Sequence, residues 1–148
     1  MASTRFLPPR LRHSPARVLV AEDDPELRRL VSAVLEYDGY EVIEAVDGTA
    51  MFEQLSRRRE KGSMPDVIVS DVFMPGLSGL DVLGKMRELG MRAPVVLMTA
   101  FSDSCSEERA RELGAVTLVE KPFELDDLRM IVLNLVPRRE APMSEAHP

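Results

Sequence analysis

Four carboxylate side chains directly follow short apolar segments of the chain, where they could bind a cation. Glu22, Asp23 and Asp24 come after Val-Leu-Val-Ala, and Asp71 comes after Val-Ile-Val-Ser. If these segments are parallel strands of one sheet, their carboxyl ends meet at one edge and the carboxylates crowd together. Crowded carboxylates repel one another unless a cation lies among them, and oxygen ligands suit Mg²⁺, with Mn²⁺ as an alternative. Asp24 precedes Pro25 and is instead expected to cap a helix.

A hydroxyl and an ammonium group follow two further apolar segments. Thr99 ends Val-Val-Leu-Met-Thr, and Lys121 follows Leu-Val-Glu. A metal ion, an aspartate, a hydroxyl and an ammonium together form a set that binds a phosphoryl group, because the cations offset the charge of its oxygens and the hydroxyl donates a hydrogen bond. Taken singly, Thr99 is typical of a strand end and Lys121 of a solvated surface. Their expected place at one sheet edge is what indicates chemistry.

The elements that must position these residues alternate between strands and helices. Such alternation predicts an α/β fold, a doubly wound parallel sheet of five strands with five helices. The expected strands are Val18 to Ala21, Val42 to Ala45, Val67 to Ser70, Val95 to Thr99 and Val116 to Val119.

Capping residues and apolar spacing mark the five expected helices. The fourth helix is short and mostly polar, so we expect it to be the least firmly packed. The signals are Asp24 to Gly39 for the first helix, Gly48 to Lys61 for the second, a capping box at Ser78 and Asp81 for the third, similar spacing at Ser104 and Glu107 for the fourth, and an apolar stripe from Leu125 to Leu135 before Pro137 for the fifth.

Length and composition restrict the class of protein. The 148 residues suit one domain, expected over 17–136. No apolar run approaches the about 20 residues of a membrane helix, so no membrane insertion is expected. Cys105 is the single cysteine, which favours a cytoplasmic setting. The net charge of −6, despite four arginines and no acid within residues 1–17, argues against direct binding of nucleic acid.

The two ends of the chain are predicted to be tails. Residues 1–16 are basic, contain three prolines and lack a sustained apolar period, so a disordered N-terminal tail is expected. Residues 137–148 are expected to form a flexible C-terminal tail.

Four segments give the chain a resemblance to a known family. They are VLVAEDDPELRRL, SDVFMPGLSGLDVL, VVLMTAFSD and VEKPF. In this order and spacing, the region from about Arg17 to Val136 resembles the receiver domain of two-component response regulators. The resemblance implies a flavodoxin-like sheet with strand order 2-1-3-4-5 and a signalling function, in which the only chemistry is self-catalysed phosphoryl transfer and slow autodephosphorylation.

The resemblance also implies a role for each candidate residue. Asp71 would accept the phosphoryl group, Glu22 and Asp23 would serve the metal with Asp71, Thr99 would be the switch hydroxyl and Lys121 would contact the phosphoryl group. The backbone carbonyl of Phe73 would complete the metal site, and the Lys121–Pro122 bond is expected to be cis.

The partners implied by the resemblance are proteins. A sensor histidine kinase or a histidine phosphotransfer protein would supply the phosphoryl group, and a downstream target would bind the fourth helix, the fifth strand and the fifth helix. The sequence leaves open whether the chain acts alone or belongs to a longer regulator.

One position departs from the family pattern. Leu118 stands three residues before Lys121, where the family usually has Tyr or Phe. This leaves open a phosphorylation-independent interaction module as the alternative function. A dehalogenase-type phosphatase is disfavoured because Phe73 stands where a second aspartate is needed, and a dinucleotide site because carboxylates replace the glycine-rich turn after the first strand.

Two phenylalanines are expected to control how long the phosphoryl group survives. In the arrangement that the chain resembles, Phe73 and Phe101 overhang the approach of water to phosphorus. Neither ring can orient an attacking water by hydrogen bonding, so slow hydrolysis is expected. Ala100 is small and leaves the donor's path open.

Overall fold

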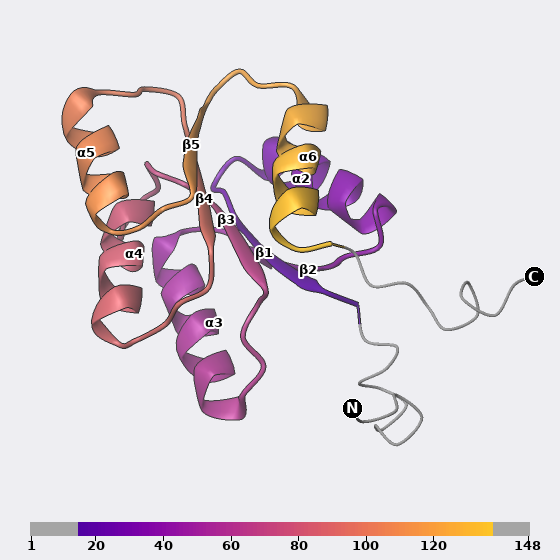
Figure 1. Ribbon diagram of the computed structural model, residues 1–148, viewed down its shortest axis with the longest axis horizontal. Coiled ribbons are helices and arrows are strands. Elements are labelled where there is room, and N and C mark those ends of the chain that lie inside the picture. Colours follow the sequence, from indigo (N-terminus) through magenta and orange to yellow (C-terminus); the bar gives the residue numbers. More distant parts are fainter. Residues whose placement is uncertain (1–14, 138–148) are drawn as a thin grey trace, which may run out of the picture.

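Five apolar segments pair into a parallel sheet in the order β2-β1-β3-β4-β5. The computed structural model describes residues 15–137. The doubly wound fold and its strand order are therefore as predicted (Figure 1). The elements are β1 (Arg17–Ala21), α2 (Pro25–Tyr37), β2 (Glu41–Ala45), α3 (Gly48–Lys61), β3 (Val67–Asp71), α4 (Gly79–Glu88), β4 (Val95–Thr99), α5 (Ser104–Glu112), β5 (Thr117–Glu120) and α6 (Leu125–Leu135).

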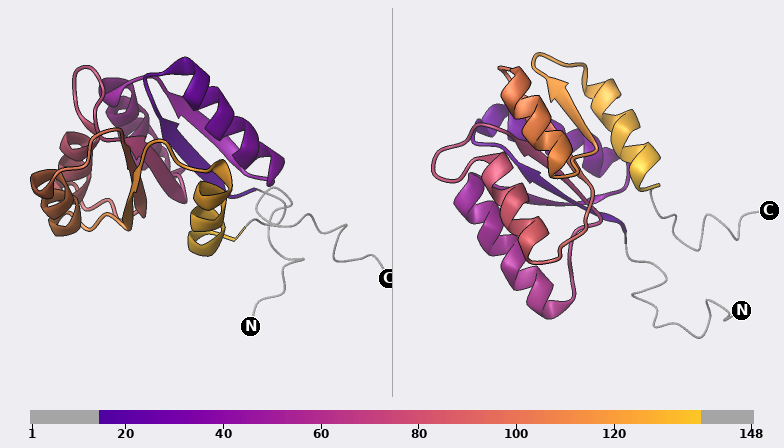
Figure 2. Two further views of the ribbon diagram at one scale, coloured as in Figure 1. Left: turned by 90° about the horizontal axis from the view of Figure 1, so that it is seen from above. Right: turned by 60° about the vertical axis from the view of Figure 1, so that its left-hand side comes forward.

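Alternating side chains of the strands build two apolar cores, one on each face of the sheet. In β1, Leu19 and Ala21 belong to the core beneath α3, α4 and α5, whereas Val18 and Val20 belong to the core beneath α2 and α6. Figure 2 shows these two helical layers on opposite faces. Within residues 15–137, no helix is long and apolar enough to cross a membrane.

Most of the predicted helix starts are present. Asp24 caps α2 by accepting from the amide of Glu26 at 3.0 Å. Ser78 and Asp81 form the predicted capping box at the start of α4, with both bonds 3.0 Å long. These caps orient the two helices that follow the strands bearing the candidate carboxylates.

The predicted cap of α5 was wrong by one residue. Asp103, in an extended conformation, accepts from the amide of Ser106 at 2.7 Å and caps the helix in place of Ser104. Glu107 accepts from the hydroxyl of Ser102 instead of closing a capping box. Asp103 is itself an effective cap because its carboxylate reaches the third helical amide.

The fifth strand is shifted by one residue from its predicted range. Its pairing with β4 runs from Val96 opposite Thr117 to Thr99 opposite Glu120. Val116 is 47% exposed and lies before the strand. Its amide donates to the carbonyl of Val95 at the point where the pairing with β4 begins. The third strand extends one residue further than predicted and includes Asp71.

Helix α5 is attached mainly at its carboxyl end. Ala110 is its one buried residue, as expected for a weakly packed helix. Beyond that end, Nε of Arg87 donates to the carbonyl of Leu113 at 2.9 Å, and Nη1 donates to Met91 at 2.8 Å. Burial at this position lowers the pKa of Arg87. Arg87 thus ties α4 to the turn after α5, whereas the amino end of α5 follows the loop from Thr99.

The predicted tails lie largely outside the described residues. Residues 1–14 and 138–148 are not described, so the predicted tails remain predictions there.

Candidate functional site

Three carboxylates meet at the carboxyl ends of β1 and β3. One oxygen each from Glu22, Asp23 and Asp71 lies within 4.8 Å of the others. Glu22 and Asp71 are buried, with 1% and 5% exposure, whereas Asp23 is exposed. The parallel pairing of β1 with β3 places the ends of these strands side by side. The cluster consists of oxygen donors alone, which fits a hard divalent cation.

Lys121 neutralises part of this cluster from the end of β5. Its Nζ lies 2.6 Å from Oε1 of Glu22 and 2.8 Å from Oδ2 of Asp71. The pKa of Lys121 is raised overall. Burial alone would lower this pKa, but the hydrogen bonds to Asp71 and Glu22 outweigh the effect of burial. The ammonium is therefore charged and bridges both buried carboxylates.

The backbone and side chain of Glu22 are held on several sides. Its Oε2 accepts from the amide of Asp24 at 3.1 Å, and its carbonyl accepts from Nη1 of Arg28 at 2.8 Å. Nε of Arg28 in turn donates to Oε1 of Glu44 at 2.9 Å. Both carboxylate oxygens of Glu22 are thus engaged, which leaves Asp23 as the more accessible acid. Desolvation of its carboxylate, followed by the hydrogen bond with Glu22, raises the pKa of Asp23.

The position of Asp71 depends on the close approach of α4. The amide of Phe73 donates to Oδ1 of Asp71 at 3.2 Å, so both Asp71 oxygens have a donor. A Cβ added to Gly79 would lie 2.2 Å from the carbonyl oxygen of Asp71. Glycine is therefore required at the first position of α4 for this helix to pack against the end of β3.

Thr99 lies at the same edge with its hydroxyl turned to the following loop. The side chain is fully buried, its hydroxyl donates to the carbonyl of Phe101 at 2.8 Å, and it accepts from the amide of Phe101 at 3.1 Å. The amide of Lys121 donates to the carbonyl of Thr99 at 2.7 Å. Strand pairing thus brings the hydroxyl and ammonium residues together as expected.

The remaining predicted residues surround this edge. Phe73 and Phe101 are 50% and 66% exposed, so neither ring is buried in the core. Ala100 is exposed. Leu118 is partly buried and packs on the core beneath α3, α4 and α5. The Lys121–Pro122 bond is cis, as the resemblance implied.

Sequence reasoning missed two positioning residues. Arg28 holds the carbonyl of Glu22, and Gly79 admits α4 against Asp71. Arg28 lies on α2, and its contact with the carbonyl of Glu22 depends on the turn between β1 and α2, which the sequence does not reveal. The Ser-Gly pair at residues 78–79 fits a helix cap equally well, so the close approach had no separate signal.

Residues 18–133 match the family model described as the response regulator receiver domain. The chain belongs to this family. As a receiver domain of two-component signalling, it has a phosphoacceptor function. The match covers both the acidic edge and the helices around it.

Individual relatives are similar over most of the receiver domain. The chain is 28% identical over 121 residues to Sporulation initiation phosphotransferase F of Bacillus subtilis, covering 82% of this chain and 94% of that protein. It is 37% identical over 115 residues to the transcriptional regulatory protein PdtaR of Mycobacterium tuberculosis, covering 77% and 53%, respectively. The structure of the chemotaxis protein CheY4 of Vibrio cholerae is similar with a TM-score of 0.72 and 28% identity, covering 82% of this chain and 98% of that one.

These relatives differ in length. The chain spans nearly all of the sporulation phosphotransferase but about half of PdtaR. The activity of any longer protein therefore does not transfer to this chain by similarity alone.

Proposed function

We propose that Asp71 is the residue on which this receiver domain accepts the phosphoryl group. The observation that carries the proposal is the geometry around its carboxylate. Asp71 is buried at the end of β3, bonded by Lys121 at 2.8 Å and clustered with Glu22 and Asp23. A nucleophilic carboxylate with a cation on one side and metal-binding oxygens on the other suits attack on phosphorus.

Glu22 and Asp23, the acidic pair, would serve Mg²⁺ or Mn²⁺ together with the carboxylate of Asp71 and the backbone carbonyl of Phe73. The metal, when bound, offsets repulsion between the attacking carboxylate and the phosphoryl oxygens. The residues fit this role because the cluster offers hard oxygen donors within 4.8 Å of one another.

The donor is a phosphohistidine of a sensor kinase or a histidine phosphotransfer protein. An Asp71 oxygen attacks phosphorus in line, the phosphorus–nitrogen bond breaks, and its electron pair remains on the imidazole nitrogen. The product is an acyl phosphate, which adds about −1.5 to −2 charge at this edge. Lys121, already 2.8 Å from Asp71, then contacts the phosphoryl oxygens.

Thr99 converts this charge into a movement of the loop before α5. Its hydroxyl exchanges the carbonyl of Phe101 for a phosphoryl oxygen, which releases the hydrogen bond that now holds the loop. This route needs no aromatic side chain, so it operates with Leu118. The weakly held amino end of α5 responds, and α5, β5 and α6 form the surface for a downstream protein.

The proposed setting is cytoplasmic, with protein partners and no direct contact to nucleic acid through this acidic domain. The second candidate function is a phosphorylation-independent interaction module, which Leu118 favours. It differs in one measurable respect, because such a module would show the same structure before and after exposure to a phosphoryl donor.

Incubation with acetyl phosphate and Mg²⁺, followed by intact-mass measurement, tests the proposal. The protein is expected to gain the mass of one phosphoryl group, and omission of Mg²⁺ with a chelator is expected to prevent the gain. An unchanged mass with Mg²⁺ present would favour the interaction module.

Mg²⁺ binding is expected to require Asp23. Replacing Asp23 with Ala removes the most accessible carboxylate of the cluster, so the Kd for Mg²⁺ measured by titration calorimetry should rise about tenfold or more. Asp24→Ala is the matched control, because Asp24 caps α2, and its Kd should stay near that of the wild type. Equal affinity in Asp23→Ala would remove Asp23 from the site.

Hydrolysis of the acyl phosphate is expected to accelerate when the two exposed rings become polar. In Phe73→Asn with Phe101→Glu, an amide and a carboxylate can orient the attacking water, so phosphoryl loss should be about tenfold faster. The measurement follows intact mass after removal of the donor. Phe73→Leu with Phe101→Leu is the control that keeps apolar side chains. If the polar double variant hydrolyses no faster than this control, the two rings do not control the access of water to the phosphorus atom.

A further inference from the structure

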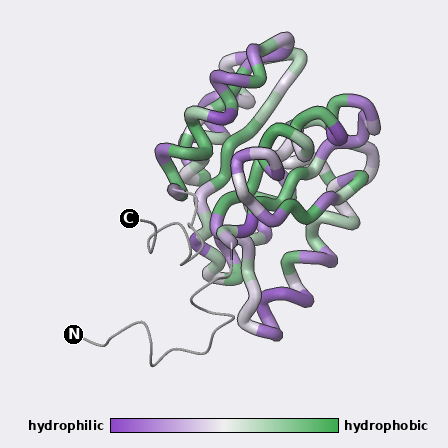
Figure 3. Tube along the Cα trace, turned by 90° about the vertical axis from the view of Figure 1, so that its right-hand side faces the viewer, coloured by the Kyte–Doolittle hydropathy of each residue, from purple (hydrophilic) through white to green (hydrophobic). Residues whose placement is uncertain are grey.

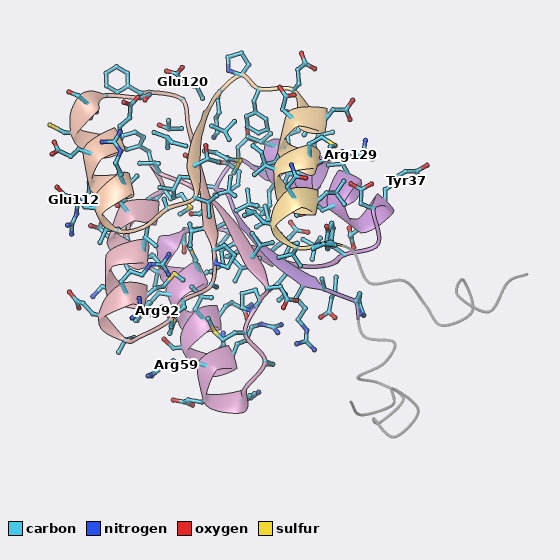
Figure 4. The ribbon with its side chains drawn as sticks, in the orientation of Figure 1. Tyr37, Arg59, Arg92, Glu112, Glu120 and Arg129 are labelled. Atoms are coloured by element: carbon cyan, nitrogen blue, oxygen red, sulfur yellow. The ribbon has the colours of Figure 1, made fainter. Side chains whose placement is uncertain are left out.

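Basic side chains gather in the last turns of α3, away from the phosphoacceptor edge. Residues 57–59 are three arginines, and Lys61 ends the helix. Figure 4 shows the labelled Arg59 beside the lower end of α3. Figure 3 shows this lower end of the molecule as strongly hydrophilic. The cluster runs against the chain's net charge of −6.

These cations have no carboxylate partner, whereas five of the ten other basic side chains within residues 15–137 have one. Within residues 15–137, Arg57, Arg58 and Lys61 form no ion pair, and Arg59 donates to the carbonyl of Leu89 at 2.9 Å. The side chains that do pair with carboxylates are Arg17, Arg28, Arg109, Lys121 and Arg129. Glu60 lies in the same turn and offsets one of the four charges, so residues 57–61 keep a net charge of +3.

Helix capping does not account for the cluster. Cations can satisfy the last carbonyls of a helix, but here the backbone already does so. Gly62, with φ of +68°, directs its amide to the carbonyls of Arg58 and Arg59, and the amide of Ser63 donates to Arg58 at 2.9 Å. The cationic side chains are thus not needed to cap the carbonyls of Arg58 and Arg59.

Three of the cations line one hollow of about 250 Å³. Its lining consists of Gln54, Arg57, Arg58, Lys61 and Ser63 and contains no carboxylate. The four α3 residues follow the spacing i, i+3, i+4, i+7 and so share one face of the helix. Nη1 of Arg58 donates to the carbonyl of Ser63 at 3.2 Å, whereas its buried Nε has no hydrogen-bond partner. This Nε is enclosed by the protein, so the donors open to a ligand in the hollow are those of the exposed Arg57 and Lys61 together with the outer part of the Arg58 guanidinium.

We propose that this hollow binds a phosphate-bearing small molecule through its diphosphate group. Guanidinium groups match phosphate oxygens with paired donors, and an ammonium adds a point charge. The hollow is smaller than the roughly 300 Å³ at which pockets for drug-sized ligands begin, which suits a compact diphosphate better than a polymer. The site would give the receiver domain a second input, independent of Asp71.

Titration with inorganic pyrophosphate in Mg²⁺-free, low-salt buffer tests the site. Backbone amide signals of residues 54–63 are expected to shift, and Arg58→Met and Lys61→Gln should each raise the Kd about tenfold. Lys61 is exposed, so its variant separates binding from folding. Arg29→Gln, which removes an exposed cation of α2, should leave the Kd unchanged.

A parallel titration with ADP identifies the source of the diphosphate. Tighter binding of ADP than of pyrophosphate assigns a nucleotide, and equal binding assigns the diphosphate alone; both support the site. Two outcomes overturn it. One is that the amide signals of all exposed basic residues shift alike and that the α3 variants do not change the Kd. The other is tighter binding of poly-glutamate than of pyrophosphate, which would assign the surface to an acidic protein.

Discussion

Asp71→Asn is expected to gain no phosphoryl mass under conditions in which the wild type becomes singly phosphorylated. The amide is a poor nucleophile and a weaker metal ligand than the carboxylate. The effect on the fold should be small, because the amide oxygen can still accept from the amide of Phe73 and the bond from Lys121 to Glu22 remains. The expected loss therefore concerns chemistry alone.

A matched control distinguishes this loss from a general effect of removing an acid. Asp127 is exposed in the first turn of α6, and Asp127→Asn should be phosphorylated like the wild type. Circular dichroism would establish that both variants are folded. Equal phosphorylation of Asp71→Asn and wild type would assign the acceptor to another residue and contradict the proposed role of Asp71.

Much of the fold could be predicted because each strand and helix carries local signals. The apolar runs, the cap at Asp24 and the Ser78–Asp81 box depend on neighbouring residues, and they appear where predicted. The errors at β5 and α5 have a different origin. Strand ends depend on pairing with β4, and the choice of Asp103 over Ser104 depends on the conformation of the preceding loop.

The candidate site was predictable in its membership but not in its contacts. Parallel strands bring their carboxyl ends to one edge, so Asp71 and Lys121 were expected together. Their separation of 50 residues in sequence gives no indication that Lys121 bridges Asp71 and Glu22 simultaneously. Nor does the sequence reveal the hydroxyl orientation of Thr99, which depends on the path of the loop to Phe101.

The contacts of Lys121 link the stability of the fold to the chemistry of the site. Glu22 and Asp71 are buried carboxylates, and this ammonium lies within hydrogen-bonding distance of both. A divalent cation among the same carboxylates would supply positive charge by another route. We therefore expect the ammonium and the metal to be partly interchangeable for stability but not for signalling, since Lys121 is also proposed to contact the phosphoryl group.

Lys121→Ala is expected to lower the free energy of unfolding by about 2 kcal/mol in Mg²⁺-free buffer. Breaking a buried ion pair typically costs about 3–5 kcal/mol, and the effect here should be smaller because the Lys121 side chain is 20% exposed. Mg²⁺ should bind this variant more tightly than the wild type and recover most of the loss. The reason is that a ligand that binds only the folded state stabilises it by RT ln(1 + [L]/Kd), where [L] is the free ligand concentration. Urea unfolding with and without Mg²⁺ measures both effects.

Two comparisons make this expectation specific. Lys121→Met keeps an apolar stem and should show the same Mg²⁺ dependence, which separates charge from packing. Arg109→Ala removes an exposed partner of Glu112 and should change stability by less than about 1 kcal/mol at any Mg²⁺ concentration. After phosphorylation, Lys121→Ala should lack the amide shifts of α5 that the wild type shows. Equal stability, equal Mg²⁺ response and equal α5 shifts in Lys121→Ala and wild type would exclude Lys121 from both the charge balance and the switch.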